Sequence, residues 1–597
     1  MLNMTNFKRS AIVFPLLLMA CAHAPQPAME RNLATTTVQA EPESEPDAGS
    51  DSDSESQTQA TEKPVALPKL ELTGPMLYDF LLGEVANQRG RPELAAQVYL
   101  ELAGDTQDPR VARRAAQLAF EARQMDKAVE ALKLWLKLEP SSTQAKQMLV
   151  TLLLSGSRLE DARPYLVEML AAYPGQAGHA FTQTYALLAR YPDKEAVFNL
   201  LLELTQPYPR VVEAHLVLAQ AAAAAGKRER ALEEVRQARV LQPDMEKAAL
   251  LEAQLLAPNS PRQALELLRN FLAAYPAAGE ARLLYARKLL EQKQYPESRV
   301  EFQRLLDAHP ESADLTFTVA MLSMEMGELD RAEAELRQAL AKGKSDEGTV
   351  YYYLGQLGEA QKHDDEALQN YRQVKEGEYA YPARLRVAYL LNKTGKLEEA
   401  RENLHQTVAQ NNEERVQLLL IEAQLLREAK QLDTAYQVLT LGLEKLPNHP
   451  DLLYEAAMLA DQIGKHDTFE QLMRKVIEIK PGHAQAYNAL GYSLLDRNER
   501  LQDAMQLVEK ANQLEPDDAG IIDSVGWGYY RLGNLNKSLE FLQRAYGFNP
   551  DPEIAAHLGE VLWMQGDKER AKKIWGEAQK AHPENAVLQA VMKKFMP

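Results

Sequence analysis

A period of 34 residues constrains this chain more than any other feature of its sequence. From Ala95 to Ala571, fourteen steps cover 476 residues, a mean of 34, and no step departs from 34 by more than one residue. The periodic position holds a small residue, with Val197 and Phe469 as larger exceptions: Ala95, Ala128, Ala162, Val197, Ala231, Ala264, Ser298, Ala332, Ala367, Ala400, Ala435, Phe469, Ala504, Ser538 and Ala571. Such a period predicts an array of stacked repeats, because each short unit buries its apolar face only against its neighbours.

Prolines and glycines recur with the same spacing. Prolines lie late in the period, at Pro140, Pro174, Pro209, Pro243, Pro276, Pro310, Pro447, Pro516, Pro550 and Pro583, and turn glycines lie at Gly90, Gly226, Gly327, Gly395, Gly464, Gly533 and Gly566. A second kind of glycine precedes the small residue by about a dozen positions, in Leu490-Gly491, Val525-Gly526 and Leu558-Gly559. Small residues let two helices cross closely and proline ends a helix, so each unit is predicted to be two antiparallel helices.

Units with this period, this glycine, this small residue and this proline resemble the tetratricopeptide repeat. We count fifteen units, of which those near 178–209 and 450–481 are the least typical. The resemblance implies an all-α fold, a right-handed α-solenoid superhelix formed by residues 72–583. Residues 584–597 place Val587, Leu588, Val591, Met592 and Phe595 on one helical face, which predicts a C-terminal capping helix.

The start of the chain resembles the signal of a bacterial lipoprotein. Lys8 and Arg9 precede a ten-residue apolar stretch, and Leu18-Met19-Ala20-Cys21 resembles a lipobox in which Met19 replaces the usual small residue. Cys21 is the only cysteine in the chain. The resemblance implies a signal peptide over residues 1–20, lipid on Cys21, and an outer-membrane protein that faces the periplasm. An ordinary secretory signal with an incidental cysteine is the alternative.

Residues 21–71 are expected to form a disordered acidic tether. The stretch from Glu41 to Glu55 carries seven acidic residues and no basic residue. Such a segment cannot bury enough apolar surface to offset the entropy lost on ordering. A docking site for a basic partner is the alternative interpretation.

Composition and motifs argue against several functions. The net charge of −18 leaves no basic excess for nucleic acid, and a mean hydropathy of −0.39 excludes a polytopic membrane protein. No phosphate loop, nucleophile elbow or zinc-protease motif is found, and the eleven histidines form no pair at metal-ligand spacing. The sequence therefore predicts no cofactor, no metal and no catalytic residue.

Binding residues are expected on the first helix of each unit, which lines the concave face in the tetratricopeptide family. Positions one and four after the crossing glycine, with their neighbours on the same stripe, hold Tyr454, Tyr492, Trp527, Tyr530, Arg531 and Trp563. Aromatic residues and arginine are typical of protein-binding hot spots. Packing between successive first helices explains these aromatics equally well, and both interpretations stay open at this stage.

The combined plan of lipobox, acidic spacer and long repeat array resembles tetratricopeptide lipoproteins that partner a carboxyl-terminal processing protease. The resemblance implies a non-enzymatic adaptor that binds this periplasmic serine protease and its peptidoglycan hydrolase substrates, and so controls cell-wall turnover. A scaffold lipoprotein of an exopolysaccharide-export or pilus-assembly complex is the alternative. An enzyme hidden within the superhelix is a third hypothesis.

Overall fold

The computed structural model describes residues 67–171 and 175–596. These residues form 31 α-helices and no strand, which confirms the all-α repeat array. The helices form fifteen pairs followed by one further helix, as the sequence predicts. The right-handed sense of a superhelix stays a prediction. The signal peptide, Cys21 and nearly all of the tether lie outside the described residues.

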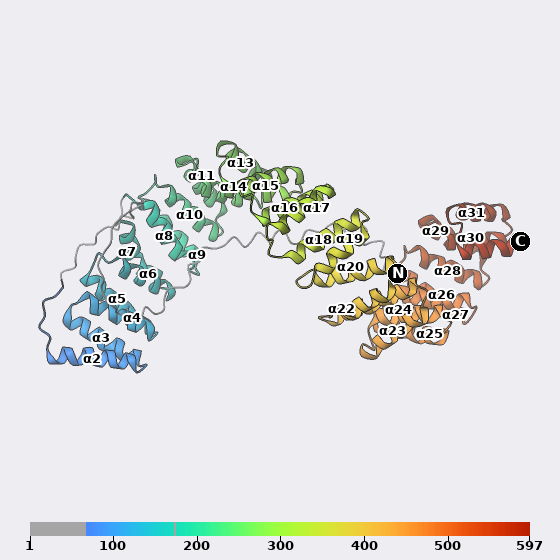
Figure 1. Cartoon of the computed structure of the whole chain (residues 1–597), viewed down its shortest axis with the longest axis horizontal. Coiled ribbons are helices and arrows are strands. Elements are labelled where there is room, and N and C mark those ends of the chain that lie inside the picture. The colour runs from blue at the N-terminus through green and yellow to red at the C-terminus, as the bar shows by residue number, and fades with distance from the viewer. Residues whose placement is uncertain (1–66, 172–174, 597) are drawn as a thin grey trace. The chain divides into compact units, whose positions relative to one another are not determined.

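The chain divides into two compact units between Lys342 and Gly343. Unit 1 contains eight helix pairs: α2 (Gly74–Gln88) and α3 (Pro92–Thr106), α4 (Pro109–Glu121) and α5 (Met125–Leu138), α6 (Thr143–Ser155) and α7 (Leu159–Ala171), α8 (Ala177–Leu188) and α9 (Lys194–Thr205), α10 (Val212–Ala224) and α11 (Arg228–Leu241), α12 (Glu246–Leu256) and α13 (Pro261–Ala274), α14 (Gly279–Glu291) and α15 (Tyr295–Ala308), and α16 (Ala313–Glu325) and α17 (Leu329–Ala341). Consecutive helices lie side by side in chain order (Figure 1).

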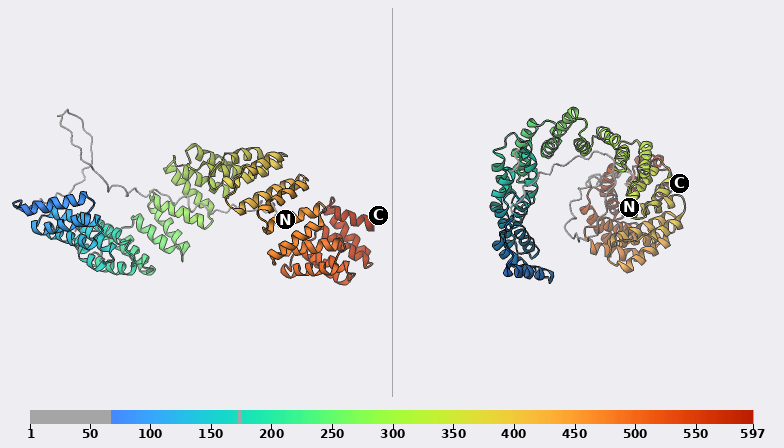
Figure 2. Two further views of the ribbon diagram at one scale, coloured as in Figure 1. Left: turned by 90° about the horizontal axis from the view of Figure 1, so that it is seen from below. Right: turned by 60° about the vertical axis from the view of Figure 1, so that its left-hand side comes forward.

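Unit 2 contains seven pairs and the last helix. The pairs are α18 (Glu347–Ala360) and α19 (Asp364–Gln373), α20 (Ala380–Lys393) and α21 (Leu397–His405), α22 (Asn412–Glu428) and α23 (Leu432–Lys445), α24 (Pro450–Gln462) and α25 (His466–Ile479), α26 (Ala484–Asp496) and α27 (Leu501–Leu514), α28 (Ala519–Arg531) and α29 (Leu535–Phe548), and α30 (Pro552–Met564) and α31 (Lys568–Ala581), and α32 (Ala586–Phe595) follows them. Figure 2 shows the same stacking of helix on helix within this unit from two further directions.

The periodic small residue is the fourth residue of the second helix in all fifteen pairs. Every one of these side chains is at most 2% exposed, including the larger Val197 and Phe469. The glycine of the first helix faces the same crossing: a Cβ on Gly491 would lie 3.0 Å from the Ala504 carbonyl oxygen, and one on Gly559 would lie 2.0 Å from Trp575 Nε1. The small residues therefore mark close helix crossings, as predicted.

The turn inside most pairs is closed by one residue with positive φ. All seven turn glycines named from the sequence have φ between 69° and 93°. Arg123, Ser157, Lys293, Lys362, Lys430 and Asn498 take the same conformation in six other pairs. A left-handed residue lets its own N–H and the next N–H bond back to the first helix, as when Gly90 N–H donates to the Asn87 carbonyl at 3.0 Å and Arg91 N–H donates to the Ala86 carbonyl at 2.9 Å.

Most of the periodic prolines follow the second helix closely. Pro140 lies two residues beyond the end of α5, and Pro583 lies two residues beyond the end of α31. Pro209 is different: α9 ends at Thr205, so this proline lies within a longer connection to α10. Asp, Ser or Asn side chains then cap many of the first helices, as Asp518 caps α28 and Asp551 caps α30.

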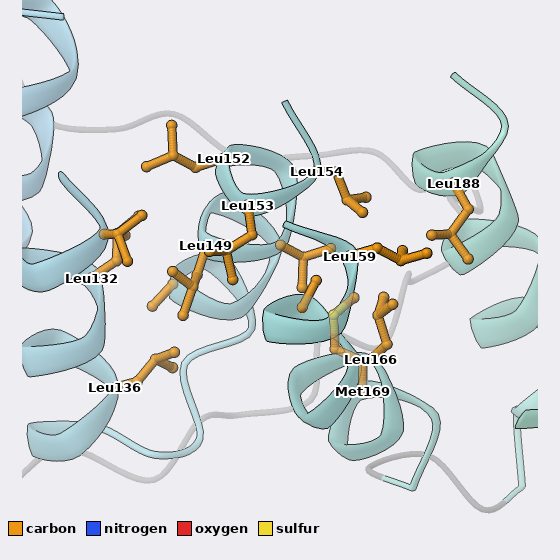
Figure 3. Close-up of a cluster of buried hydrophobic side chains, with 14 of the residues drawn as sticks. Leu132, Leu136, Leu149, Leu152, Leu153, Leu154, Leu159, Leu166, Met169 and Leu188 are labelled. Carbon is orange, nitrogen blue, oxygen red and sulfur yellow. The ribbon is translucent and has the colours of Figure 1, made fainter. Parts of the chain in front are cut away.

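The core of each unit is a series of buried apolar clusters between successive helices. Figure 3 shows one part of it, where leucines of α5, α6, α7 and α8 converge. Leu149, Leu153 and Leu166 are each fully buried there. Because each repeat packs against its neighbours and supplies part of their core, the array has no separate centre.

Helix α32 closes the C-terminal end of unit 2 by packing on α30 and α31. Leu588 is 1% exposed, and the Phe595 ring lies 5.9 Å from both Trp563 and Trp575, measured between ring centroids. The predicted capping helix is confirmed, although Val587 lies outside the buried face with 38% of its surface exposed.

Candidate protein-binding surfaces

The outer face of α2 is apolar and exposed. Leu77, Tyr78, Leu81 and Val85 are between 43% and 64% exposed, and they follow the spacing of one helical stripe. No helix among the described residues precedes α2 in the array. An exposed apolar stripe of this kind is typical of a protein-interaction surface.

The sequence did not reveal this surface, because an apolar stripe on a repeat helix normally faces a neighbouring repeat. Phe80 on the same helix meets the Tyr99 ring of α3 edge-on, with ring centroids 6.0 Å apart, and is still 45% exposed. A signal was present in the register: Leu77, Leu81 and Val85 precede the first recognisable periodic residue, Ala95, so no earlier repeat was available to cover them.

Four of the six residues expected to bind partners lie together in α26 and α28. Trp527 is 6% exposed and stacks on the His557 ring, with centroids 4.1 Å apart and planes 20° apart. Tyr530 lies 4.9 Å from Trp527, and Arg531 lies 5.7 Å from the same ring. Tyr492 is half-buried, 6.1 Å from His557. Trp527 therefore packs between successive first helices, while Tyr492, Tyr530 and Arg531 keep accessible surface.

The other two expected residues lie elsewhere. Tyr454 of α24 stacks on His483, with ring centroids 5.1 Å apart. Trp563 of α30 packs against Trp575 at 5.8 Å and against Phe595 of the capping helix. The six residues thus fall into three separate groups of ring contacts, and their role in binding stays a prediction.

A buried ion pair beneath Trp527 escaped the sequence analysis. His557 Nδ1 and Asp523 Oδ2 are 2.9 Å apart, and both side chains are less than a tenth exposed. Burial opposes protonation of the imidazole, but the charge of Asp523 and its hydrogen bond outweigh burial and raise the pKa of His557. The separation of 34 residues was the available signal, because residues one period apart on first helices become neighbours.

Several carboxylates lie in and beside helices α26, α28 and α30 of unit 2. Burial raises the pKa of Glu553, and the charges of Asp523, Asp551 and Asp496 raise it further, against the opposite effect of His557. Burial likewise raises the pKa of the Tyr492 phenol, with added contributions from Glu553, Asp523 and Asp496. Tyr530 donates to Glu560 Oε1 at 3.0 Å, and burial followed by the Glu560 charge raises the pKa of this phenol to about 12. The first helices α26, α28 and α30 therefore share a negative electrostatic environment.

Within the described ranges, no group of three or more histidine, cysteine or acidic side chains could hold a metal ion. Among the described residues, no helix has the length and apolar character needed to cross a bilayer. The best-defined hollows lie at the turns of unit 2. One of about 420 Å³ is lined by Lys362, Asp364 and Thr394, and another of about 470 Å³ is lined by His466, Glu470 and Arg500.

Comparison with known proteins identifies the repeats directly. Family models described as tetratricopeptide repeat match residues 255–314, 289–357 and 450–483. The TPR repeat-containing protein PA4667 of Pseudomonas aeruginosa is 33% identical over 487 residues, which cover 81% of this chain and 82% of that protein.

Solved structures with similar helices include a thermophilic TPR protein of Thermus thermophilus, at 21% identity and a TM-score of 0.28 over 30% of this chain and 98% of that one. A tetratricopeptide repeat protein of Parabacteroides merdae gives 16% identity and a TM-score of 0.33 over 48% of this chain and 99% of that one. The extended identity to the Pseudomonas protein, together with the matching repeat models, shows that this chain belongs to the tetratricopeptide-repeat proteins and is a protein-binding scaffold.

Proposed function

We propose that this scaffold is an outer-membrane lipoprotein that serves as a protease adaptor. Lipid on Cys21 anchors it, residues 21–71 act as a tether, and the repeats face the periplasm. The array holds a carboxyl-terminal processing serine protease and its peptidoglycan hydrolase substrates together, which raises their effective concentration and promotes proteolysis. The chain itself contributes no chemical step. The resemblance of the whole plan to protease-partnering lipoproteins supports this choice of partner.

The observation that carries the proposal is the uncovered apolar stripe of α2. An inter-repeat surface that meets no repeat must be covered by something else, because terminal repeats need a polar outer face for solubility. Leu77, Leu81 and Val85 offer an interface typical of a stable complex, with apolar anchors in the centre. A lipid-anchored adaptor needs such a permanent docking site if its protease is to remain at the membrane.

A pull-down from periplasmic extract tests the proposal. The full-length protein in detergent is expected to retain a serine protease of the carboxyl-terminal processing class, and the double variant Leu77→Asp/Leu81→Asp is expected to lose it. Leu441→Asp is the matched control, because Leu441 is 60% exposed on α23 of unit 2. Circular dichroism should show equal helicity for all three proteins.

The result also separates the alternatives. If the wild-type protein retains no such protease, the adaptor role is wrong. Recovery of an outer-membrane porin or secretin in its place would favour the export or pilus-assembly scaffold. If the protease is retained equally by Leu77→Asp/Leu81→Asp and by the wild type, the partner is right but α2 is not its docking site.

A further inference from the structure

Three neighbouring first helices each place one carboxylate near Tyr492. Asp496 comes from α26, Asp523 from α28 and Glu553 from α30. The Asp523 carboxylate lies 2.9 Å from Nδ1 of His557 in α30, and the His557 ring lies 6.1 Å from the Tyr492 ring, measured between centroids. Helices α26 and α28 pack together, and so do α28 and α30. We define Tyr492, Asp496, Asp523 and Glu553 as the acidic site.

Two polar atoms beneath this site lack the hydrogen bond that their burial demands. Asp523 is 6% exposed and its Oδ2 accepts a hydrogen bond from His557 Nδ1, but no described residue donates to its Oδ1. Trp527 is also 6% exposed, and its Nε1 finds no acceptor among the described residues. Buried polar atoms in folded proteins nearly always have partners, and these two atoms lie in adjacent turns of one helix, so a ligand bound at this place would find an acceptor and a donor that no described residue uses.

The charge balance around the site is negative. Residues 484–567, which carry α26 to α30, contain thirteen acidic and six basic residues. Four of the basic residues are occupied away from the acidic site: Arg497 pairs with Glu499, Arg500 with Glu470, Arg544 with Asp517, and Lys537 lies over the Tyr529 ring. Arg531 lies at the site, but its guanidinium donates to the backbone carbonyl of Asp496 at 3.0 Å and not to a carboxylate. The carboxylates of Asp496 and Glu553 form no ion pair with a described residue. Positive charge brought by a partner would relieve their mutual repulsion.

The spread of the carboxylates over three repeats decides what kind of cation fits. They do not form a group that could hold one metal ion. An extended polypeptide with several lysine or arginine side chains can contact carboxylates on successive helices at once. The methylene groups of these side chains would pack on the Tyr492 ring.

We propose that the acidic site on α26, α28 and α30 binds a basic, extended segment of a partner protein. Lysine or arginine side chains of that segment pair with Asp496 and Glu553 and supply the donor that Asp523 Oδ1 lacks. The inference rests on the scaffold being a protein binder and does not depend on which protease it holds, so the site is independent of the α2 stripe.

Fluorescence anisotropy with defined peptides tests this site without any protease. The probe is a fluorescein-labelled dodecapeptide, Lys-Ala-Ser repeated four times, with Gln-Ala-Ser and Glu-Ala-Ser peptides of equal length for comparison. The full-length protein in detergent is expected to bind the lysine peptide at least tenfold more tightly than the glutamine peptide, and more weakly as salt increases. Equal binding of the lysine and glutamine peptides, or no binding of the lysine peptide, would overturn the proposal.

Variants locate the binding. Asp496→Asn/Glu553→Gln changes two exposed side chains and is expected to weaken lysine-peptide binding about tenfold, while Asp523→Asn tests the buried acceptor. Asp517→Asn/Glu540→Gln removes the same charge from exposed positions of the same repeats, in the turn before α28 and on the second helix α29, and is expected to leave binding within about twofold. If the control pair weakens binding as much as Asp496→Asn/Glu553→Gln, only the net charge matters and the site is wrong. Because the protease pull-down depends on α2, either proposal can fail without the other.

Discussion

The first and last helices of the array end it in opposite ways. At the C-terminal end, α32 covers the last pair, and the rings of Trp563, Trp575 and Phe595 pack into one another beneath it. At the N-terminal end, α2 carries an apolar stripe on which no described helix packs. Among the described residues, the array therefore covers its C-terminal end with its own helix and leaves the apolar stripe of α2 uncovered. A repeat array needs both surfaces covered to remain soluble, and only one of these covers is encoded within the described chain.

The largest expected effect is at the covered end. Leu588→Asp puts a charge where Leu588 is 1% exposed, so α32 should detach and the unfolding free energy of unit 2 should fall by about 3 kcal/mol. Hydrogen exchange of α30 and α31 amides measures the loss. The adjacent variant Val587→Asp, at a position that is 38% exposed, should change stability by less than about 0.5 kcal/mol. Similar losses for both variants would mean that α32 does not act as a cap.

The same glycine-to-alanine substitution at a helix crossing should reduce stability by different amounts at the two ends of the array. Gly559→Ala places its Cβ 2.0 Å from Trp575 Nε1, where the ring is fully buried and held by α32, so we expect a loss of about 3 kcal/mol. Gly83→Ala places its Cβ 2.7 Å from Tyr99 Cε2, but α2 can move outward, so the loss should be about 1 kcal/mol. Denaturant unfolding of both variants gives the difference. Equal losses would show that α2 is held as firmly as α30.

The smallest expected effect is the loss of folding stability at low pH that Glu84 causes. Tyr99 donates to Glu84 Oε1 at 2.6 Å and this bond, with the Arg114 guanidinium, lowers the pKa of Glu84 against the opposing effect of burial. A lowered pKa in the folded state gives stability that is present above pH 4.5, the ordinary value, and is lost as the pH falls below it. Because Glu84 is partly solvated, the loss should be under about 1 kcal/mol. Thermal melts at pH 6 and pH 3.5 should differ less for Glu84→Gln than for the wild type; an unchanged difference would contradict this role.

The sequence predicts the repeat fold well, because the period is a direct record of helix crossings. Every periodic residue from Ala95 to Ala571 is buried at the same position of a second helix, including the bulky Val197 and Phe469. Glycine marks the turns less consistently than the small residue marks the helix crossings, because solvent-exposed turns also accept Lys362 or Asn498 with positive φ. Proline at position 209 did not mark a helix end, since α9 stops four residues earlier.

The candidate sites were harder to predict, because binding and packing use the same residue types. Trp527 has the aromatic character of a hot spot, yet it is stacked on His557 and nearly inaccessible. The stripe of α2 has the same periodicity as buried stripes and differs only in what adjoins it. Residues separated by one period were the signal that would have found the His557–Asp523 pair, and Glu560 with Lys594 of the cap has the same spacing of 34 residues.

The turns that lack glycine are positions where substitution should increase the stability of the folded protein. Arg123, Ser157, Lys293, Lys362, Lys430 and Asn498 each hold a left-handed backbone that side chains disfavour. Replacement by glycine should relieve about 0.5–1 kcal/mol at each turn. The turns belong to different repeats, so the gains should largely add. An engineer seeking a heat-resistant version could therefore exchange these six residues without altering the α2 stripe or the acidic site.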